Sequence, residues 1–194
     1  MDSANHDAPD RADMARLTGG HDAALNDLMD RHAVTVFRFL CRMLGNEEDA
    51  NDLAQETFVR VYRARASYRP EQTFSTWRFT IAANLARNQL RWRSRHRNVS
   101  LDAESATREQ TLGESLPAAT PTPDQSTEAA ERAEAVRAAV QALPEDLREA
   151  VVLCEWEDLP VAEAAAVLHT TSKAVESRLY RARQQLRERL KRWL

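Results

Sequence analysis

The segment Phe74–Arg97 constrains the chain most, because its 24 residues include no acidic side chain, no glycine and no proline. An uninterrupted run of this length predicts a helix, with Ser75 expected to cap its N-terminus. Six arginines lie along it, together with Trp77, Phe79 and Trp92. We therefore expect one long, strongly basic helix near the middle of the chain.

This helix is expected to have two unlike faces. The apolar face carries Phe79, Ala82, Ala83, Ala86 and Leu90. The opposite face carries Trp77, Thr80, Asn84, Asn88 and Arg91. An aromatic ring can stack on an unpaired base, amides can meet base edges, and arginines can hold phosphates. An amphipathic helix whose arginines are merely solvated explains the same residue types equally well, so the residues alone leave both interpretations open.

The composition favours an all-α chain with one or two small helical cores. Only four of the 194 residues are glycine, and Ala, Leu, Arg and Glu are abundant. The net charge of −3 hides the basic segment, because acidic segments balance it. No apolar run approaches the ~20 residues of a membrane span. Residues 1–20 are polar and close with a glycine pair, so we expect a disordered tail rather than a signal peptide.

The cysteines and histidines do not form a metal-binding pattern. Cys41 and Cys154 lie far apart in apolar surroundings, and the five histidines are scattered. We expect two buried, reduced thiols in a cytoplasmic protein, with no disulfide, metal or cofactor. His32 lies on the apolar stripe of a helix expected at 22–44, where a core histidine is a better interpretation than a ligand.

An acidic face is expected on the next helix, at 47–66. Gly45 should end the preceding helix, and Asn46 should cap this one. The face consists of Asp49, Asp52, Gln55 and Glu56. Acids in the first turns also suit the helix dipole, so a solvated face is the simpler interpretation. The alternative is a docking face for a basic partner protein.

The composition changes after this first part. Residues 99–128 lose all periodicity and contain three prolines among Ser, Thr, Ala and Glu. We expect a flexible linker there, so that two folded domains, at 21–98 and 129–194, can sit apart on a larger body. No phosphate-binding glycine loop, Walker lysine or metal-binding acid cluster is found, which argues against an enzyme.

The last part of the chain predicts a helix-turn-helix. Helices are expected at 128–143, 145–156, 161–168 and 173–194, with a polar turn at 169–172. A narrow apolar stripe on the last helix leaves polar side chains free to read base edges in a major groove. These side chains are Lys173, Glu176, Ser177, Tyr180 and Arg181, with Arg178 among the flanking cations. A surface helix with solvated arginines is the alternative, but the short helix and turn before it favour DNA.

Two segments resemble bacterial RNA polymerase sigma factors of the extracytoplasmic-function (ECF) type. The first joins DANDLAQETFVRVYRA, at 49–64, to FSTWRFTIAANLARNQLR, at 74–91. The second runs over 142–190, from ALPEDLREAVVLCEWEDLPVAEAAAVL to AVESRLYRARQQLRERL. Their order and spacing are highly specific, whereas a helix-turn-helix alone would not be.

The resemblance implies that 21–98 is sigma region 2 and 129–194 is sigma region 4. Region 2 would dock on the β′ clamp helices of core RNA polymerase through Asp49, Asp52, Gln55 and Glu56, which reverses the preference for a solvated face. The β subunit of the polymerase is a further implied contact. Region 2 would also melt the promoter −10 element, with Asn84 at the position that contacts a flipped base. The implied −10 residues are Tyr68, Phe74, Trp77, Thr80, Asn84, Arg87, Asn88 and Arg91. The implied −35 residues are Lys173, Glu176, Ser177, Arg178, Tyr180 and Arg181.

Two positions depart from the family pattern, and two other functions stay open. Glu176 lies where members often have arginine, which leaves the −35 sequence open but not the −35 role. Arg78 lies where leucine is common, and we expect it to enlarge the basic face. The resemblance also implies a separate anti-sigma partner. The alternatives are a stand-alone helix-turn-helix regulator, which would bind duplex DNA without polymerase, and an RNA-binding module.

Overall fold

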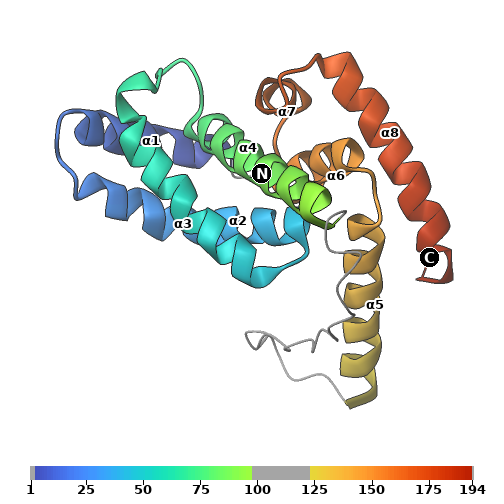
Figure 1. The fold of residues 1–194 in the computed structure, drawn as a ribbon. Coiled ribbons are helices and arrows are strands. Elements are labelled where there is room, and N and C mark those ends of the chain that lie inside the picture. Colours follow the sequence, from blue (N-terminus) through green and yellow to red (C-terminus); the bar gives the residue numbers. More distant parts are fainter. Residues whose placement is uncertain (1–2, 98–122, 194) are drawn as a thin grey trace.

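The computed structural model describes residues 3–97 and 123–193, and every regular element in these two ranges is helical (Figure 1). This confirms the all-α prediction. The first half contains α1 (Ser3–Thr18), α2 (Ala24–Leu44), α3 (Glu47–Arg63), a 3₁₀ turn (Arg65–Ser67) and α4 (Phe74–Arg97). The second half contains α5 (Pro123–Gln141), α6 (Glu145–Val151), a π turn (Val152–Trp156), α7 (Val161–Val167), α8 (Ser172–Arg189) and a 3₁₀ turn (Lys191–Trp193). The predicted linker at 99–128 lies outside the described residues up to 122, and α5 already begins at Pro123.

Helix α1 corrects the prediction of a disordered tail at 1–20. Met14 and Leu17 are fully buried, and they share an apolar cluster with Leu28 of α2 and Phe74 of α4. The two residues are three positions apart, so one side of a mostly polar helix can still pack against the bundle. The average composition of residues 1–20 is polar in spite of these two apolar residues, which is why the sequence predicts a disordered tail.

Ion pairs between α1 and α2 neutralise the acids that make the tail look polar. The His32 Nε2 atom lies 2.8 Å from both carboxylate oxygens of Asp10. Arg31 donates to Asp10 at 3.0 Å and to Asp13 at 2.5 Å. Burial lowers the pKa of His32 although Asp10 opposes it. Burial would raise the pKa of Asp10, but its bonds to His32 and Arg31 outweigh burial and lower it. A neutral His32 therefore donates from Nε2 to the carboxylate, as expected of a core histidine.

The helix ends follow local sequence signals, with one correction. Asn46 caps α3 by accepting from the Asp49 N–H at 2.8 Å, and Gly45 ends α2 in the left-handed conformation with φ 66°. Ser75 does not cap α4. The Thr73 hydroxyl accepts from the Thr76 N–H at 3.2 Å instead, so the helix begins one residue earlier than Ser75.

Helix α4 lies on the side of the first half that faces the second (Figure 1), because it packs on α2 and α3 and also on α7. Phe79, Ala82, Ala83 and Ala86 are fully buried, as the predicted apolar face requires. A single apolar cluster runs from α2 through α4 into α6, α7 and α8. The two halves therefore share one continuous core.

Candidate nucleic-acid and polymerase interfaces

An aromatic cluster forms where the loop before α4 meets the helix. The ring centroids of Tyr68 and Trp77 are 5.2 Å apart, and both side chains are half-buried. Tyr68 donates from its hydroxyl to the Gln72 carbonyl at 3.0 Å, which fixes the loop, and burial raises the pKa of Tyr68. Phe74 has no exposed surface, and its ring centroid lies 6.2 Å from that of Trp77. Phe74 therefore supports the two outer rings from beneath, which differs from the predicted contact with DNA.

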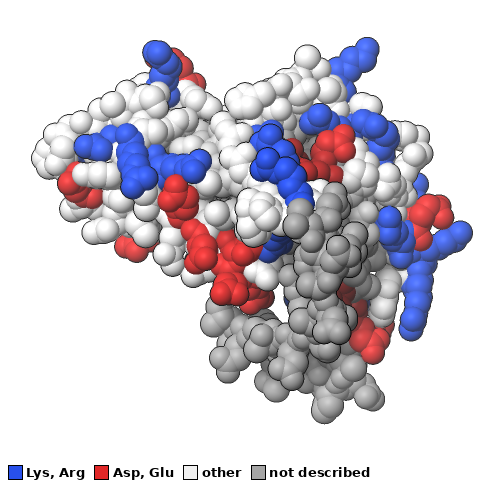
Figure 2. Space-filling view, in the orientation of Figure 1, with Lys and Arg blue, Asp and Glu red and all other residues white. Residues whose placement is uncertain are grey.

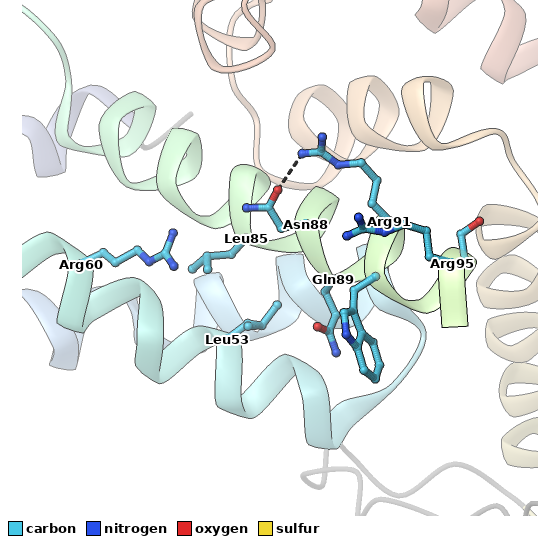
Figure 3. A pocket seen from close by; sticks show the side chains of 9 residues that line it. Leu53, Arg60, Leu85, Asn88, Gln89, Arg91 and Arg95 are labelled. Carbon is cyan, nitrogen blue, oxygen red and sulfur yellow. Dashed lines mark hydrogen bonds between the residues drawn. The ribbon is translucent and has the colours of Figure 1, made fainter. Parts of the chain in front are cut away.

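The polar part of the α4 face is organised by arginine–asparagine pairs. Arg87 donates to the amide oxygen of Asn84 at 2.7 Å. Arg91 donates to the amide oxygen of Asn88 at 2.6 Å, the bond drawn as a dashed line in Figure 3. These bonds fix the orientation of both amides and leave the NH₂ groups for other partners. Thr80 is half-buried and donates to the Thr76 carbonyl at 2.8 Å. Asn84, Asn88 and Arg91 thus lie along one accessible edge of the helix.

A groove of about 710 Å³ opens between α3 and the C-terminal half of α4 (Figure 3). Trp92 stacks on His96 with ring centroids 4.2 Å apart and is 49% exposed. The chemistry of the groove is cationic and aromatic, which suits a phosphate backbone. Arg60, Arg91, Trp92 and Arg95 line it beside Leu53, Leu85, Asn88, Gln89 and Ser94.

Arg78 does not enlarge this basic surface, and the prediction that it does is wrong. The side chain is only 4% exposed, and its guanidinium stacks 4.5 Å from the Phe79 ring centroid. Burial lowers the pKa of Arg78 to about 10, against the opposing charges of Asp10 and Glu157. The sequence places Arg78 on the helix but cannot reveal that neighbouring elements cover it.

The acidic residues of α3 are mostly exposed. Figure 2 shows acidic side chains gathered over the N-terminal part of α3, with basic ones over its other end and over α4. Asp52 and Gln55 face solvent, and Glu56 accepts from Arg60 at 2.8 Å. Asp49 instead pairs with Arg93 and accepts from Gln89 at 3.1 Å. Asp49 therefore ties α3 to α4, while the other three remain available to a partner.

Helices α7 and α8 meet at a tight turn. His169 takes a left-handed conformation with φ 50°, and the Thr170 N–H donates to the Ala165 carbonyl at 2.9 Å. Thr171 then caps α8 through the Ala174 N–H at 3.2 Å. This turn fixes the angle between the two helices.

The exposed side of α8 carries the predicted base-reading residues. Tyr180 is 63% exposed, and Gln184 donates to its hydroxyl at 2.8 Å. Arg178 is the exception, because it is half-buried and lies 3.6 Å from Asp146 of α6. The buried side consists of Val175, Leu179 and Ala182. The exposed residues are Lys173, Glu176, Ser177, Tyr180 and Arg181.

Comparisons with known proteins identify the family. Residues 28–96 match the family model of sigma-70 region 2, and residues 133–186 match that of sigma-70 region 4. The sigma factor CarQ of Myxococcus xanthus is 40% identical over 91% of this chain and 95% of its own length. The ECF sigma factor SigW of Bacillus subtilis is 30% identical over 89% of this chain and 91% of its own length. The chain belongs to the ECF family of sigma factors.

Other relatives of this sigma factor differ in length or in how closely they resemble it. The ECF sigma factor SigE of Mycolicibacterium smegmatis is 38% identical over 85% of the chain, which spans 61% of the relative. The structure of CnrH in complex with the cytosolic domain of CnrY is 27% identical, covers 94% of this chain and 97% of its own, and superposes with a TM-score of 0.69. The sigma factor RpoE from Bartonella quintana, solved with the anti-sigma factor NepR, is 22% identical. The match covers 86% of this chain and 96% of RpoE, and the two share the fold with a TM-score of 0.68.

Within the described ranges, the sigma factor has no group of three His, Cys, Asp or Glu side chains placed to hold a metal. None of the helices in those ranges is long and apolar enough to cross a membrane. Cys41 and Cys154 are free and half-buried, and burial raises the pKa of each thiol to about 11.

From the sequence, no binding role is assigned to the groove residues Arg60, Trp92 and Arg95, although Trp92 and Arg95 count among the aromatic and basic residues of Phe74–Arg97. Arg60 lies on the helix chosen for its acids, so its approach to α4 was invisible. The signal that could have found the others was the arginine run of Phe74–Arg97, which continues past the predicted face.

Proposed function

We propose that this sigma factor docks on core RNA polymerase and directs initiation at promoters read by two separate faces. Region 2 (21–98) holds the melted −10 element and region 4 (129–194) reads the −35 element. The observation that supports this proposal best is that one chain has two surfaces with different side-chain chemistry, one on α4 and one on α8. The α4 edge offers rings, amides and arginines for unpaired strands, whereas α8 presents a polar face of the kind that enters a duplex groove.

At the −10 element, Trp77 and Tyr68 offer a surface on which an unpaired base stacks. Stacking on an aromatic side chain contributes roughly 1–3 kcal/mol per base, which is comparable with the few kcal/mol that unpairing costs. The amide of Asn84 lies beside this surface and meets the edge of a flipped base. Arg87, Asn88 and Arg91 follow it along α4 and hold the strand.

At the −35 element, α8 inserts into the major groove with Lys173, Glu176 and Ser177 nearest its N-terminus. Arginine–guanine contacts are the commonest specific pairs, and glutamate accepts from the amino group of cytosine. Arg181 and Tyr180 lie one turn further on. Arg178 reaches the DNA only after releasing Asp146, so its contact costs one ion pair.

On the polymerase, Asp52, Gln55 and Glu56 bind the basic clamp helices of β′, and region 4 lies against the β subunit. Asp49 contributes to this face by holding α3 against α4. A separate anti-sigma factor covers these surfaces and keeps the protein inactive. The sigma factor acts in the cytoplasm as a non-catalytic DNA-binding subunit, without metal or cofactor.

A gel-shift experiment with and without core polymerase, on a library of promoter fragments, tests the function. We expect weak binding by the sigma factor alone and sequence-specific binding with the polymerase. Permanganate footprinting of the selected promoters should detect unpaired thymines, and Asn84→Ala should reduce melting more than polymerase binding. Equal sequence-specific binding without polymerase would support the stand-alone regulator instead.

A further inference from the structure

The loop before α4 is anchored on helix α1. Figure 1 shows α1 beside this connection, and α1 contacts both the 3₁₀ turn that precedes the loop and α4 itself. The Thr18 hydroxyl, at the end of α1, donates to the Arg65 carbonyl of that turn at 3.4 Å. Burial raises the pKa of Tyr68, Asp7 raises it further, and Arg11 opposes both. Charged side chains of α1 therefore lie near the one tyrosine of the loop.

A row of rings leads from α1 to the proposed base-stacking surface. Asp10 of α1 pairs with His32, whose Nε2 atom lies 2.8 Å from both carboxylate oxygens. The centroid of the His32 ring lies 5.4 Å from that of Phe74. The Phe74 centroid lies 6.2 Å from that of Trp77 and 6.4 Å from that of Tyr68. These separations are typical of packed aromatic pairs, so Asp10 is linked to the two outer rings through two buried ones.

The apolar side of α1 covers the same rings from beneath. Met14 and Leu17 share one apolar cluster with Phe74, and none of the three has exposed surface. Tyr68 and Trp77 pack against this cluster as half-buried residues. Close packing holds buried side chains in single conformations. Without α1, Phe74 would be exposed and the two outer rings would lose their fixed support.

Helix α1 is attached to the bundle largely through charged groups. Arg31 of α2 donates to Asp10 at 3.0 Å and to Asp13 at 2.5 Å. Arg16 of α1 donates to Asp27 of α2 at 3.1 Å in an exposed ion pair. Elements with few buried apolar contacts open locally at a lower free energy than the core of a domain. The docking of α1 can therefore change while the rest of region 2 stays folded.

We infer that α1 is a positioning element for the −10 surface, with Asp10 and Met14 as positioning residues for the rings on which an unpaired base stacks. Both residues are buried, so they act through Phe74 and His32 and not by touching DNA. The identity of the bound strand rests on the proposed function, whereas the anchoring of the loop does not. The acidic residues of α3 and the exposed side of α8 lie outside this cluster, so polymerase docking and −35 binding should not depend on α1.

Hydrogen exchange followed by mass spectrometry measures the anchoring on the full chain without DNA. Asp10→Ala removes the acceptor of His32, and Met14→Ala leaves a cavity beneath Phe74. Each substitution should speed amide exchange at 65–77 roughly tenfold, because the loop loses its support while the bundle stays folded.

Two control variants distinguish positioning from a general loss of stability. Leu147→Ala truncates a buried side chain of α6, outside the cluster under α1, and should leave exchange at 65–77 unchanged. Met14→Leu keeps the buried volume and should behave as the natural chain. Circular dichroism checks that all variants remain helical.

Fluorescence anisotropy measures the effect on strand binding, with the complex of sigma factor and core polymerase and with core polymerase alone as background. The probe is a labelled single-stranded oligonucleotide that carries the −10 element of a promoter selected in the gel-shift experiment. Asp10→Ala and Met14→Ala should raise its Kd roughly tenfold, which is within the range for the loss of one stacked base. Affinity for core polymerase should not change.

An abasic oligonucleotide provides a readout that a merely structural role would not move. When the base that stacks on the rings is absent, the natural chain and the two α1 variants should bind with the same Kd. A scan that places the abasic site at each position in turn identifies that base. Because coupling is reciprocal, a saturating concentration of the intact oligonucleotide should also slow exchange in α1 of the natural chain.

The outcomes separate the positioning role from the proposed function. Variants that bind the intact strand as tightly as the natural chain would overturn the positioning role and leave the proposed function standing. Faster loop exchange without weaker strand binding would overturn it as well, because α1 would then only stabilise the fold. A complex that does not prefer the selected strand to one of mixed sequence would contradict the proposed function and the positioning role together.

Discussion

Gly45 shows how a single position joins the two halves. Its φ of 66° is a conformation that side chains with a Cβ adopt at a cost, and a Cβ built there would lie 2.8 Å from the Gln141 side chain. The glycine therefore ends α2 and also leaves room for the residue that caps its carbonyls.

We predict that Gly45→Ala destabilises the protein by about 1–2 kcal/mol, from backbone strain and displacement of Gln141. Urea unfolding followed by circular dichroism measures the change. In a double-mutant cycle, Gln141→Ala should relieve the steric part, so the two substitutions together should cost less than their sum. Strict additivity would show that only the backbone conformation matters.

At the scale of elements, helix α1 is the largest difference between sequence and structure. The chain predicts α2, α3 and α8 well, because each carries an apolar stripe with a recognisable cap or breaker. α1 has only Met14 and Leu17 among polar residues, and its acids are neutralised by Arg31 and His32 of the next helix. These ion pairs and hydrogen bonds join residues far apart in the sequence, so no local sequence pattern predicts them.

We predict that Met14→Ala lowers the free energy of unfolding by about 2–4 kcal/mol, because the side chain is fully buried. Arg11→Ala, on the exposed side of the same helix, should change it by less than ~0.5 kcal/mol. Thermal unfolding of both variants measures the contrast. Equal effects would mean that α1 does not dock on the bundle in solution.

Some residues of the candidate site can be predicted from local sequence, whereas the placement of others depends on contacts with distant parts of the chain. Trp77, Asn84 and the exposed residues of α8 are predictable, since helical periodicity decides which side they occupy. Phe74 and Arg78 are not, because neighbouring elements bury them. Family resemblance supplies a role for each position, but only the packing shows which side chains are accessible.

For the whole molecule, the two halves pack through carboxylates whose protonation changes on burial. Burial raises the pKa of Glu149 to about 7 although Arg87 opposes it, and raises that of Glu157 to about 7 although Arg42 opposes it. Separation would return both towards the ordinary value of 4.5. Glu149 is also influenced by Glu145, Asp146 and Arg178, and Glu157 by Arg38, Arg78 and Asp158.

The closed form, in which the two halves are packed together, therefore binds more protons than an open form with the halves separated, between pH 4.5 and about 7. Its added stability is present at the acid end of this window and is lost as pH rises through about 7. We predict that the ratio of closed to open molecules falls roughly tenfold per glutamate from pH 6 to pH 8. Single-molecule energy transfer between dyes at Val34→Cys on α2 and Arg187→Cys on α8, in a chain that also carries Cys41→Ala and Cys154→Ala, measures this ratio.

The matched control is the double variant Glu149→Gln and Glu157→Gln, which imitates the protonated form without a titratable group. It should stay closed across the range, and its energy transfer should not vary with pH. His32 and Asp10 both lie within the first half, remain paired when the halves separate, and so do not contribute. If the double variant retained the pH dependence of the natural chain, the titrating groups would lie elsewhere. Glu149 and Glu157 would then not set the ratio of closed to open molecules.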